Sequence, residues 1–152
     1  MILIAAPLAL ALAAAAAPQP VPIAHLGEIR MHLFHTGTGR LSPDISPPRA
    51  FAGWNTVIGE GDSGGRADDL VVVAELVTNG EQFIAPTLRI VARGPRGRII
   101  GQRSFASILT SHEGRAYLPL WLNDVTCVGD LRVTVSFGRE TRSETLQLNC
   151  GE

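Results

Sequence analysis

Glycine and proline interrupt this chain so often that a long helix is not expected in it. Sixteen glycines and ten prolines are spread over 152 residues, and no long stretch keeps the apolar period of an amphipathic helix. Between the interruptions, short runs alternate apolar and polar residues or are largely apolar, which is typical of strands. The predicted strands cover residues 28–35, 69–78, 87–93, 98–106, 115–122, 131–137 and 145–150.

Seven or so short strands in about 130 residues that follow an N-terminal leader predict an all-β fold. We expect an antiparallel two-sheet sandwich of the immunoglobulin-like type, with a small closed β-barrel as the alternative. The proline-containing segment from Leu41 to Trp54 is predicted to be a long ordered crossover between two early strands.

The last two predicted strands suggest how the two cysteines of the chain are arranged. If Gly138 and Arg139 form a two-residue turn, residues whose numbers sum to 277 face each other, so Cys127 lies opposite Cys150. A longer turn shifts this register by two residues but keeps the same faces together. An exported chain meets oxidising conditions, and the spacing is not that of a redox-active C-x-x-C pair. We therefore predict a disulfide between Cys127 and Cys150.

The N-terminal residues predict export. An apolar run from Ile2 to Ala17 precedes a proline-rich stretch, which is typical of a signal peptide, although no Lys or Arg precedes the run. The run is shorter than the roughly 20 residues of a spanning helix. The predicted organisation is a signal peptide over residues 1–17, a flexible segment over 18–27 and a single β-sandwich domain over 28–152. The protein is expected to be periplasmic or secreted, with no transmembrane anchor after processing.

The charge of the chain argues against one class of function. The formal net charge is −1, and all thirteen basic residues are arginines. A dedicated nucleic-acid binder needs an excess of cations to pair with phosphates. We therefore expect no nucleic-acid partner.

The stretch GDSGG at residues 61–65 matches the residues around the nucleophilic serine of chymotrypsin-like proteases. Those enzymes also need a histidine base and an orienting carboxylate, which two barrels bring to a serine late in the chain. Too few residues precede Ser63 for a first barrel. Glycine, aspartate and serine are common in turns, so we interpret this stretch as a loop and assign no catalytic residue.

The same loop carries a candidate calcium site. Glu60, Asp62, Asp68 and Asp69 offer the oxygen ligands that Ca²⁺ prefers, but their spacing does not match a helix-loop-helix calcium site. A solvated acidic turn is the alternative interpretation. We expect no cofactor, with Ca²⁺ as the option that this loop leaves open.

Three histidines near the start of the domain suggest a copper or zinc site. His25, His32 and His35 lie close in sequence, with Met31 beside them. On a strand, His32 and His35 point to opposite faces, so they cannot share an ion without a bulge or a bend. Surface histidines are the alternative.

Five arginines fall on two neighbouring predicted strands and their turn, where Arg93, Arg96 and Arg98 form a candidate anion-binding surface. The alternative is that these charges keep the hairpin tip soluble and an edge strand unpaired. Arg89 is also expected to face solvent. Arg103 conflicts with this assignment, since it has the same parity as Phe105, which is expected to point inward. That conflict predicts a bulge near Gly101 or a misplaced strand end.

The segment YLPLWL has two apolar rows. Tyr117, Pro119 and Trp121 alternate with three leucines. Two apolar rows are typical of a strand that is covered on both sides or contacts a partner. A sugar-binding platform of exposed aromatic residues is a further hypothesis for this segment.

The stretches WNTVIGEGD, ADDLVV, PLWLNDVTC and LNCGE together resemble a family of small, uncharacterised exported bacterial proteins. The resemblance covers most of the predicted mature chain and implies an envelope location, but it implies no activity or ligand. We expect an exported, non-enzymatic β-sandwich module of the bacterial envelope, with an envelope protein or a glycan as its partner. The alternatives are a periplasmic protein that binds Ca²⁺ or Cu/Zn and a small serine hydrolase that uses Ser63.

Overall fold

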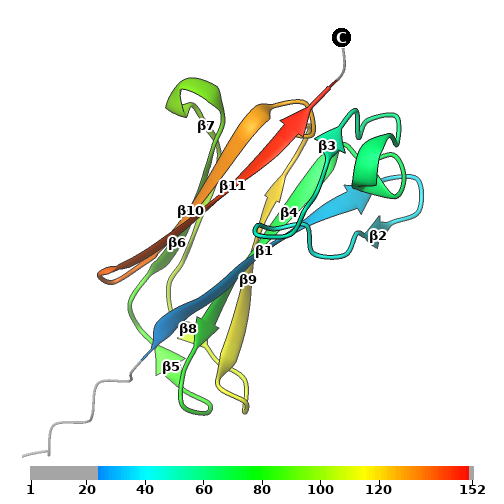
Figure 1. The fold of residues 1–152 in the computed structure, drawn as a ribbon. Coiled ribbons are helices and arrows are strands. Elements are labelled where there is room, and N and C mark those ends of the chain that lie inside the picture. The colour runs from blue at the N-terminus through cyan, green and yellow to red at the C-terminus, as the bar shows by residue number, and fades with distance from the viewer. Residues whose placement is uncertain (1–23, 151–152) are drawn as a thin grey trace, which may run out of the picture.

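The computed structural model describes residues 24–150, which fold as a two-sheet β-sandwich (Figure 1). One sheet has four strands in the order β2-β1-β4-β9, and the other has five in the order β3-β11-β10-β6-β7. The strands are β1 His25–His35, β2 Arg40–Leu41, β3 Gly53–Trp54, β4 Asp69–Val77, β5 Phe83–Ile84, β6 Leu88–Arg93, β7 Ile99–Phe105, β8 Ile108–Leu109, β9 Arg115–Leu122, β10 Gly129–Phe137 and β11 Glu140–Asn149. Two short 3₁₀ turns, η1 Gly61–Ser63 and η2 Pro95–Gly97, lie in the connections, and β5 and β8 form a separate small sheet.

The all-β sandwich predicted from the sequence is confirmed. The chain passes from β1 and β4 to β6 and β7 on the other sheet, returns for β9, and ends with β10 and β11, as in immunoglobulin-like sandwiches. The disulfide departs from the usual pattern of antibody domains, because it joins the residues just before β10 and just after β11 of one sheet and does not link the two sheets. No helix within residues 24–150 is long and apolar enough to cross a membrane.

The seven predicted strands are all present; β9 has the predicted bounds, and the other six differ at one or both ends. β1 begins at His25, so residues 25–27 belong to a strand and not to the predicted flexible segment. A bulge between Leu26 and Ile29 explains the difference, since it interrupts the alternation from which the strand start was judged. The predicted signal peptide, 1–17, lies outside the described residues, as do 18–23.

Inward-facing rows of both sheets form one hydrophobic core. β4 contributes Leu70, Val72, Ala74 and Leu76, and β9 contributes its leucines. Across the core, β10 contributes Leu131, Val133 and Val135. Burial of these rows is the main favourable contribution to folding, and it determines which face of each strand points outward.

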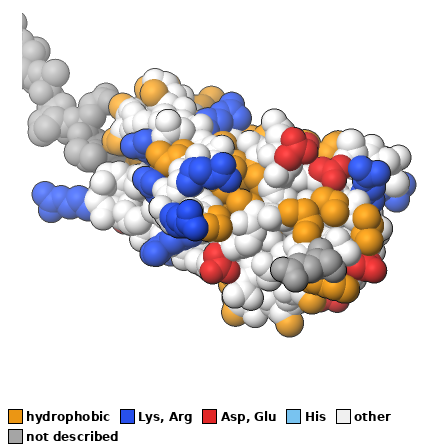
Figure 2. Space-filling view, turned by 90° about the horizontal axis from the view of Figure 1, so that it is seen from above, with side chains coloured by type: hydrophobic (Ala, Val, Ile, Leu, Met, Phe, Trp, Pro, Cys, Tyr) orange, Lys and Arg blue, Asp and Glu red, His pale blue; other side chains and the backbone are white. Residues whose placement is uncertain are grey.

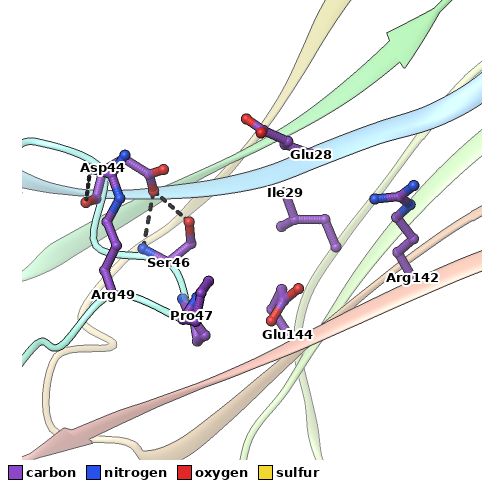
Figure 3. A pocket seen from close by; sticks show the side chains of 9 residues that line it. Glu28, Ile29, Asp44, Ser46, Pro47, Arg49, Arg142 and Glu144 are labelled. Atoms are coloured by element: carbon purple, nitrogen blue, oxygen red, sulfur yellow. Dashed lines mark hydrogen bonds between the residues drawn. The ribbon is translucent and has the colours of Figure 1, made fainter.

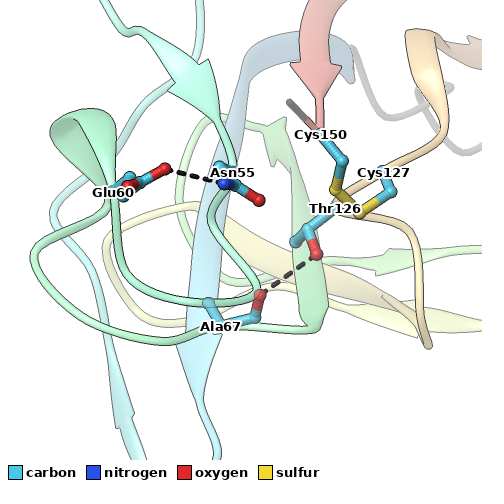
Figure 4. Close-up of a disulfide and its surroundings, with 6 residues drawn as sticks. All are labelled: Asn55, Glu60, Ala67, Thr126, Cys127 and Cys150. Atoms are coloured by element: carbon cyan, nitrogen blue, oxygen red, sulfur yellow. Dashed lines mark hydrogen bonds between the residues drawn. A yellow bond between two sulfur atoms is a disulfide. The ribbon is translucent and has the colours of Figure 1, made fainter. Parts of the chain in front are cut away.

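The closing hairpin has the predicted register. Phe137 pairs with Glu140 and Gly129 with Leu148, so Gly138 and Arg139 form a two-residue turn in which Gly138 has a φ of 57°. The same register brings Cys127 and Cys150 together in a disulfide with their Cα atoms 5.0 Å apart (Figure 4). The predicted disulfide is confirmed.

The predicted crossover between Leu41 and Trp54 runs along the open edge of β1. The carboxylate of Asp44 fixes it there by accepting hydrogen bonds from the Met31 amide (3.1 Å) and from the amide and hydroxyl of Ser46 (3.0 and 2.6 Å). Partial burial would raise the pKa of Asp44, but these hydrogen bonds outweigh burial and hold the pKa below its ordinary value. The crossover ends in β3, which pairs in parallel with the end of β11.

Candidate functional site

The outer face of the four-stranded sheet exposes aromatic and apolar side chains to solvent. On β9 every second residue points outward, which leaves Tyr117 and Trp121 50% and 45% exposed. Pro119 lies between them, and Val71 and Val73 of β4 lie beside them. We call the set formed by Phe34, Val73, Tyr117, Pro119 and Trp121 the aromatic face; Val71 points the same way beside Trp121 but is only 6% exposed. Contiguous apolar surface of this kind typically marks an interaction site.

Neighbouring side chains hold both rings in place. Trp121 packs edge-on against Phe34 with ring centroids 4.8 Å apart, and its indole N–H donates to Asp69 at 2.9 Å. The guanidinium of Arg30 lies 5.5 Å from the centre of the Tyr117 ring. The two aromatic side chains are four residues apart on one strand, and so about 13 Å from each other.

A buried carboxylate lies at one end of the aromatic face. Glu75 of β4 points outward but is only 4% exposed, because Arg115 forms an ion pair with it and the Glu28 amide donates to it at 3.2 Å. Gly27 leaves the space that Glu75 fills, since a Cβ at Gly27 would overlap the carboxylate. Burial alone would raise the pKa of Glu75, but the hydrogen bonds and the ion pair hold it below its ordinary value.

The charges on this face are therefore satisfied within the protein. Glu28 pairs with Arg30 at 3.2 Å, Glu75 pairs with Arg115, and Asp69 accepts from Trp121 and from the Asp124 amide. This face therefore offers a partner ring surface and polar groups that are already paired or hydrogen-bonded, with one negative charge, that of Asp69, outside the ion pairs of residues 24–150.

A pocket of about 370 Å³ lies on another side of the molecule, between β1, β11 and the 44–49 segment (Figure 3). Its charged lining consists of Glu28, Asp44, Arg49, Arg142 and Glu144. These opposite charges largely cancel, and Asp44 already accepts three hydrogen bonds. The two buried polar atoms without a partner among the described residues, on Thr56 and Gln82, do not line this pocket. The pocket therefore shows weaker signs of a binding site than the aromatic face.

Ser63 lies in η1 and is 2% exposed. Its hydroxyl donates to the Glu60 carbonyl at 3.0 Å and accepts from the Gly65 amide at 3.4 Å. The glycine-flanked serine thus stabilises its own loop through backbone hydrogen bonds.

The four candidate calcium ligands each make a separate contact. Asp62 accepts from the Ala52 amide at 2.8 Å, and Glu60 accepts from the Asn55 side chain at 2.7 Å (Figure 4). Asp68 lies 3.8 Å from Arg66, and Asp69 belongs to the aromatic face's hydrogen bonds. Across residues 24–150, no group of three or more His, Cys, Asp or Glu side chains is placed to hold a metal ion.

The histidines are not brought together either. Met31 is fully buried in the core, whereas the neighbouring His32 points outward and contacts the Ser42 carbonyl through Nδ1 at 2.9 Å. His35 contacts the Arg66 carbonyl at 3.3 Å, and His25 lies at the other end of β1. The calcium and the copper or zinc sites both stay predictions for metal-binding measurements to test.

The arginine hairpin has the predicted bulge. The β6–β7 register shifts where Ala92 pairs with Gly101 and Arg93 with Ile99. Arg103 has the inward parity of Phe105 but lies on an edge strand, so it reaches past the edge and donates to the Pro119 carbonyl at 3.0 Å. Arg89 and Arg93 face solvent as predicted, and Arg96 and Arg98 lie in the exposed turn.

Comparison of the chain with protein-family models and with curated proteins gives no match. The side chains described above are therefore the basis for any functional assignment.

Proposed function

We propose that the protein is an exported, non-enzymatic module of the bacterial envelope that binds a neutral glycan chain on its aromatic face. The observation that carries this proposal is the pair of half-exposed rings, Tyr117 and Trp121, on one face of β9. The C–H face of a sugar ring packs on an aromatic ring, and two rings about 13 Å apart suit a short oligosaccharide.

Four further observations support the proposal. Two ion pairs join four of the charged groups on the aromatic face, and both oxygens of the fifth, Asp69, accept hydrogen bonds within the protein, which favours an uncharged partner. The rings sit on a strand of a rigid sheet, so little order is lost on binding. The burial of Ser63 and its backbone hydrogen bonds support a non-enzymatic role. The Cys127–Cys150 disulfide fits an oxidising compartment outside the cytoplasm.

The test is calorimetric titration of the exported protein with neutral gluco- and chito-hexasaccharides. Tyr117→Ala should weaken binding about tenfold, which corresponds to the loss of an aromatic contact worth about 1.4 kcal/mol. Tyr117→Phe keeps the ring and should retain most of the affinity. Phe83→Ala is the matched control, because Phe83 is an exposed ring on β5, outside the aromatic face.

Two outcomes contradict the proposal. One is that none of these glycans binds, or that Phe83→Ala weakens binding as much as Tyr117→Ala. The other is self-association without glycan binding, seen by sedimentation and abolished by Tyr117→Ala, which would assign the aromatic face to a second copy of the chain.

A further inference from the structure

A second surface lies on the other sheet and carries unpaired positive charge. We propose that one end of the five-stranded sheet, formed by Arg93, Arg96, Arg98, Ile99 and Arg132, docks on the headgroups of an anionic lipid bilayer. These five residues are the basic end. The inference goes beyond the glycan binding proposed above, because it uses different residues on the opposite sheet.

Three of these residues form a row across neighbouring strands. Arg132 on β10 lies opposite Arg93 on β6, and Arg93 lies opposite Ile99 on β7. Adjacent strands are about 4.8 Å apart, so the row is about 10 Å wide. Like charges directly opposite each other destabilise a sheet. The Arg93–Arg132 pair is therefore unfavourable for folding, and a negatively charged surface would compensate it.

The basic end has little internal compensation. The ion pairs found within residues 24–150 include none of its four arginines. Asp130 is the nearby carboxylate on the same strand, two residues from Arg132, and it too is outside those ion pairs. Arg93 donates to the Gly97 carbonyl at 2.9 Å, which holds its guanidinium over the turn and leaves further N–H donors for a phosphate.

The turn between β6 and β7 holds Arg96 in a strained backbone conformation. Arg96 has φ 58° and ψ 20°, a left-handed conformation that glycine adopts more readily than arginine. Strain of this kind concentrates at functional positions, where something other than folding stability favours the residue. Here the effect is to present the exposed Arg96 side chain at the tip of the sandwich.

The apolar member of the row favours a bilayer over other anionic partners. Ile99 is 46% exposed beside Arg93 and Arg98. An apolar side chain flanked by cations fits the boundary of an anionic membrane, where the cations contact phosphates and the apolar group enters the acyl region. Figure 2 looks down on this end and shows more arginine side chains on one half, whereas the other half mixes arginine with most of the visible acidic side chains.

The test is partitioning of the exported, processed protein onto phosphatidylcholine vesicles with and without about 30% phosphatidylglycerol. We expect binding to the anionic vesicles alone, and its loss in about 1 M salt, where charges are screened within about 3 Å. The double variant Arg96→Gln/Arg98→Gln should weaken binding about 25-fold, or about fivefold per arginine. The matched control Arg139→Gln/Arg142→Gln removes the same charge at the other end of the same sheet, and it should change binding less than about twofold.

Fluorescence tests the insertion of position 99. An Ile99→Trp variant should gain emission that is quenched by lipids brominated on their acyl chains, relative to the wild type. Equal binding to both kinds of vesicle, equal losses in the two double variants, or no quenching at position 99 would each overturn the proposal. So would arginine-dependent binding to a phosphorylated polysaccharide without binding to vesicles, because the phosphate would then belong to a glycan. Far-UV circular dichroism of every variant checks that the fold is retained.

Discussion

Removing the Cys127–Cys150 disulfide by substituting both cysteines with alanine tests how the closing hairpin is stabilised. The bond links positions 23 apart and closes the β10–β11 hairpin just beyond its last pair, Gly129 and Leu148. In the chain-entropy treatment, a closed loop of this length restricts the unfolded chain by about 3 kcal/mol at 25 °C. The double variant is expected to lose that amount of stability. Because unfolding entropy is about 2.1 cal/mol/K per residue, the thermal midpoint of a domain of this size should fall by roughly 11 °C.

Reversible urea unfolding, followed by far-UV circular dichroism, measures this loss. The folded hairpin keeps its nine backbone pairs in the variant, so its near-native spectrum at low urea is the check on structure. Wild-type protein unfolded and refolded in reductant should reproduce the stability of the variant, since both lack the same covalent link.

The size of the loss decides whether the reasoning is right. A stability loss below about 1 kcal/mol would refute the chain-entropy account for this hairpin. Kinetics then locate the hairpin on the folding pathway, since removal of the bond slows folding if the hairpin is closed in the transition state and speeds unfolding if it closes later.

Three further perturbations test other parts of the structure. Glu75→Gln should cost about 2 kcal/mol at neutral pH, because a charged hydrogen-bond acceptor is replaced. Because the pKa of Glu75 is lower in the folded protein, the ionised carboxylate stabilises the fold at pH values above its ordinary pKa of 4.5. This stabilisation is lost as the pH falls below 4.5, so the stability of the Glu75→Gln variant should depend less on pH in that range. Asp44→Ala removes the acceptor of three hydrogen bonds and should destabilise the protein by about 2 kcal/mol in urea unfolding, with earlier proteolysis of the 41–54 crossover. Millimolar Ca²⁺ should leave the thermal midpoint unchanged, because the four carboxylates of the acidic loop make separate contacts; a rise that a chelator reverses would show that they converge on an ion.

The features that local patterns encode were predicted from the sequence. Alternation predicted which faces of β10 and β11 lie together, and the observed register is the one expected for a two-residue turn at Gly138 and Arg139, whereas a longer turn would have shifted it by two residues. The bulge predicted near Gly101 is present in β7, but it lies before Arg103, which keeps the inward parity of Phe105 and avoids the core by reaching past the sheet edge. Both inferences need only residues close in sequence.

The features that depend on distant residues were not predicted. Nothing near Glu75 in the sequence indicates that it is buried by Arg115 and by a bulge in β1. The parallel pairing of β3 with β11 likewise joins segments from opposite ends of the domain. Two-residue strands such as β2 and β5 are too short to show a period.

The aromatic face was predicted in part from the sequence. Both rows of β9 are apolar, so the sequence indicated a strand with two apolar faces but not which face the core covers. Packing of the five-stranded sheet on the leucine row leaves Tyr117 and Trp121 outside, and this arrangement creates the aromatic face. The exposure of the two rings therefore depends on how the two sheets pack, which the sequence of β9 alone does not show.

The two proposed surfaces are compatible because the sandwich separates them. The aromatic face lies on the outside of the β1-β4-β9 sheet, whereas the basic end is formed by β10, β6 and β7 of the other sheet. A domain that contacts a bilayer through the turn between β6 and β7 keeps the outer face of β9 clear of the lipid. The free edge of β9 is also occupied within the protein. Arg103 of β7 donates to the Pro119 carbonyl there, which blocks this edge from pairing with another strand. Recognition by this domain is therefore expected to use side chains on its outer faces and turns, and not strand addition at the β9 edge.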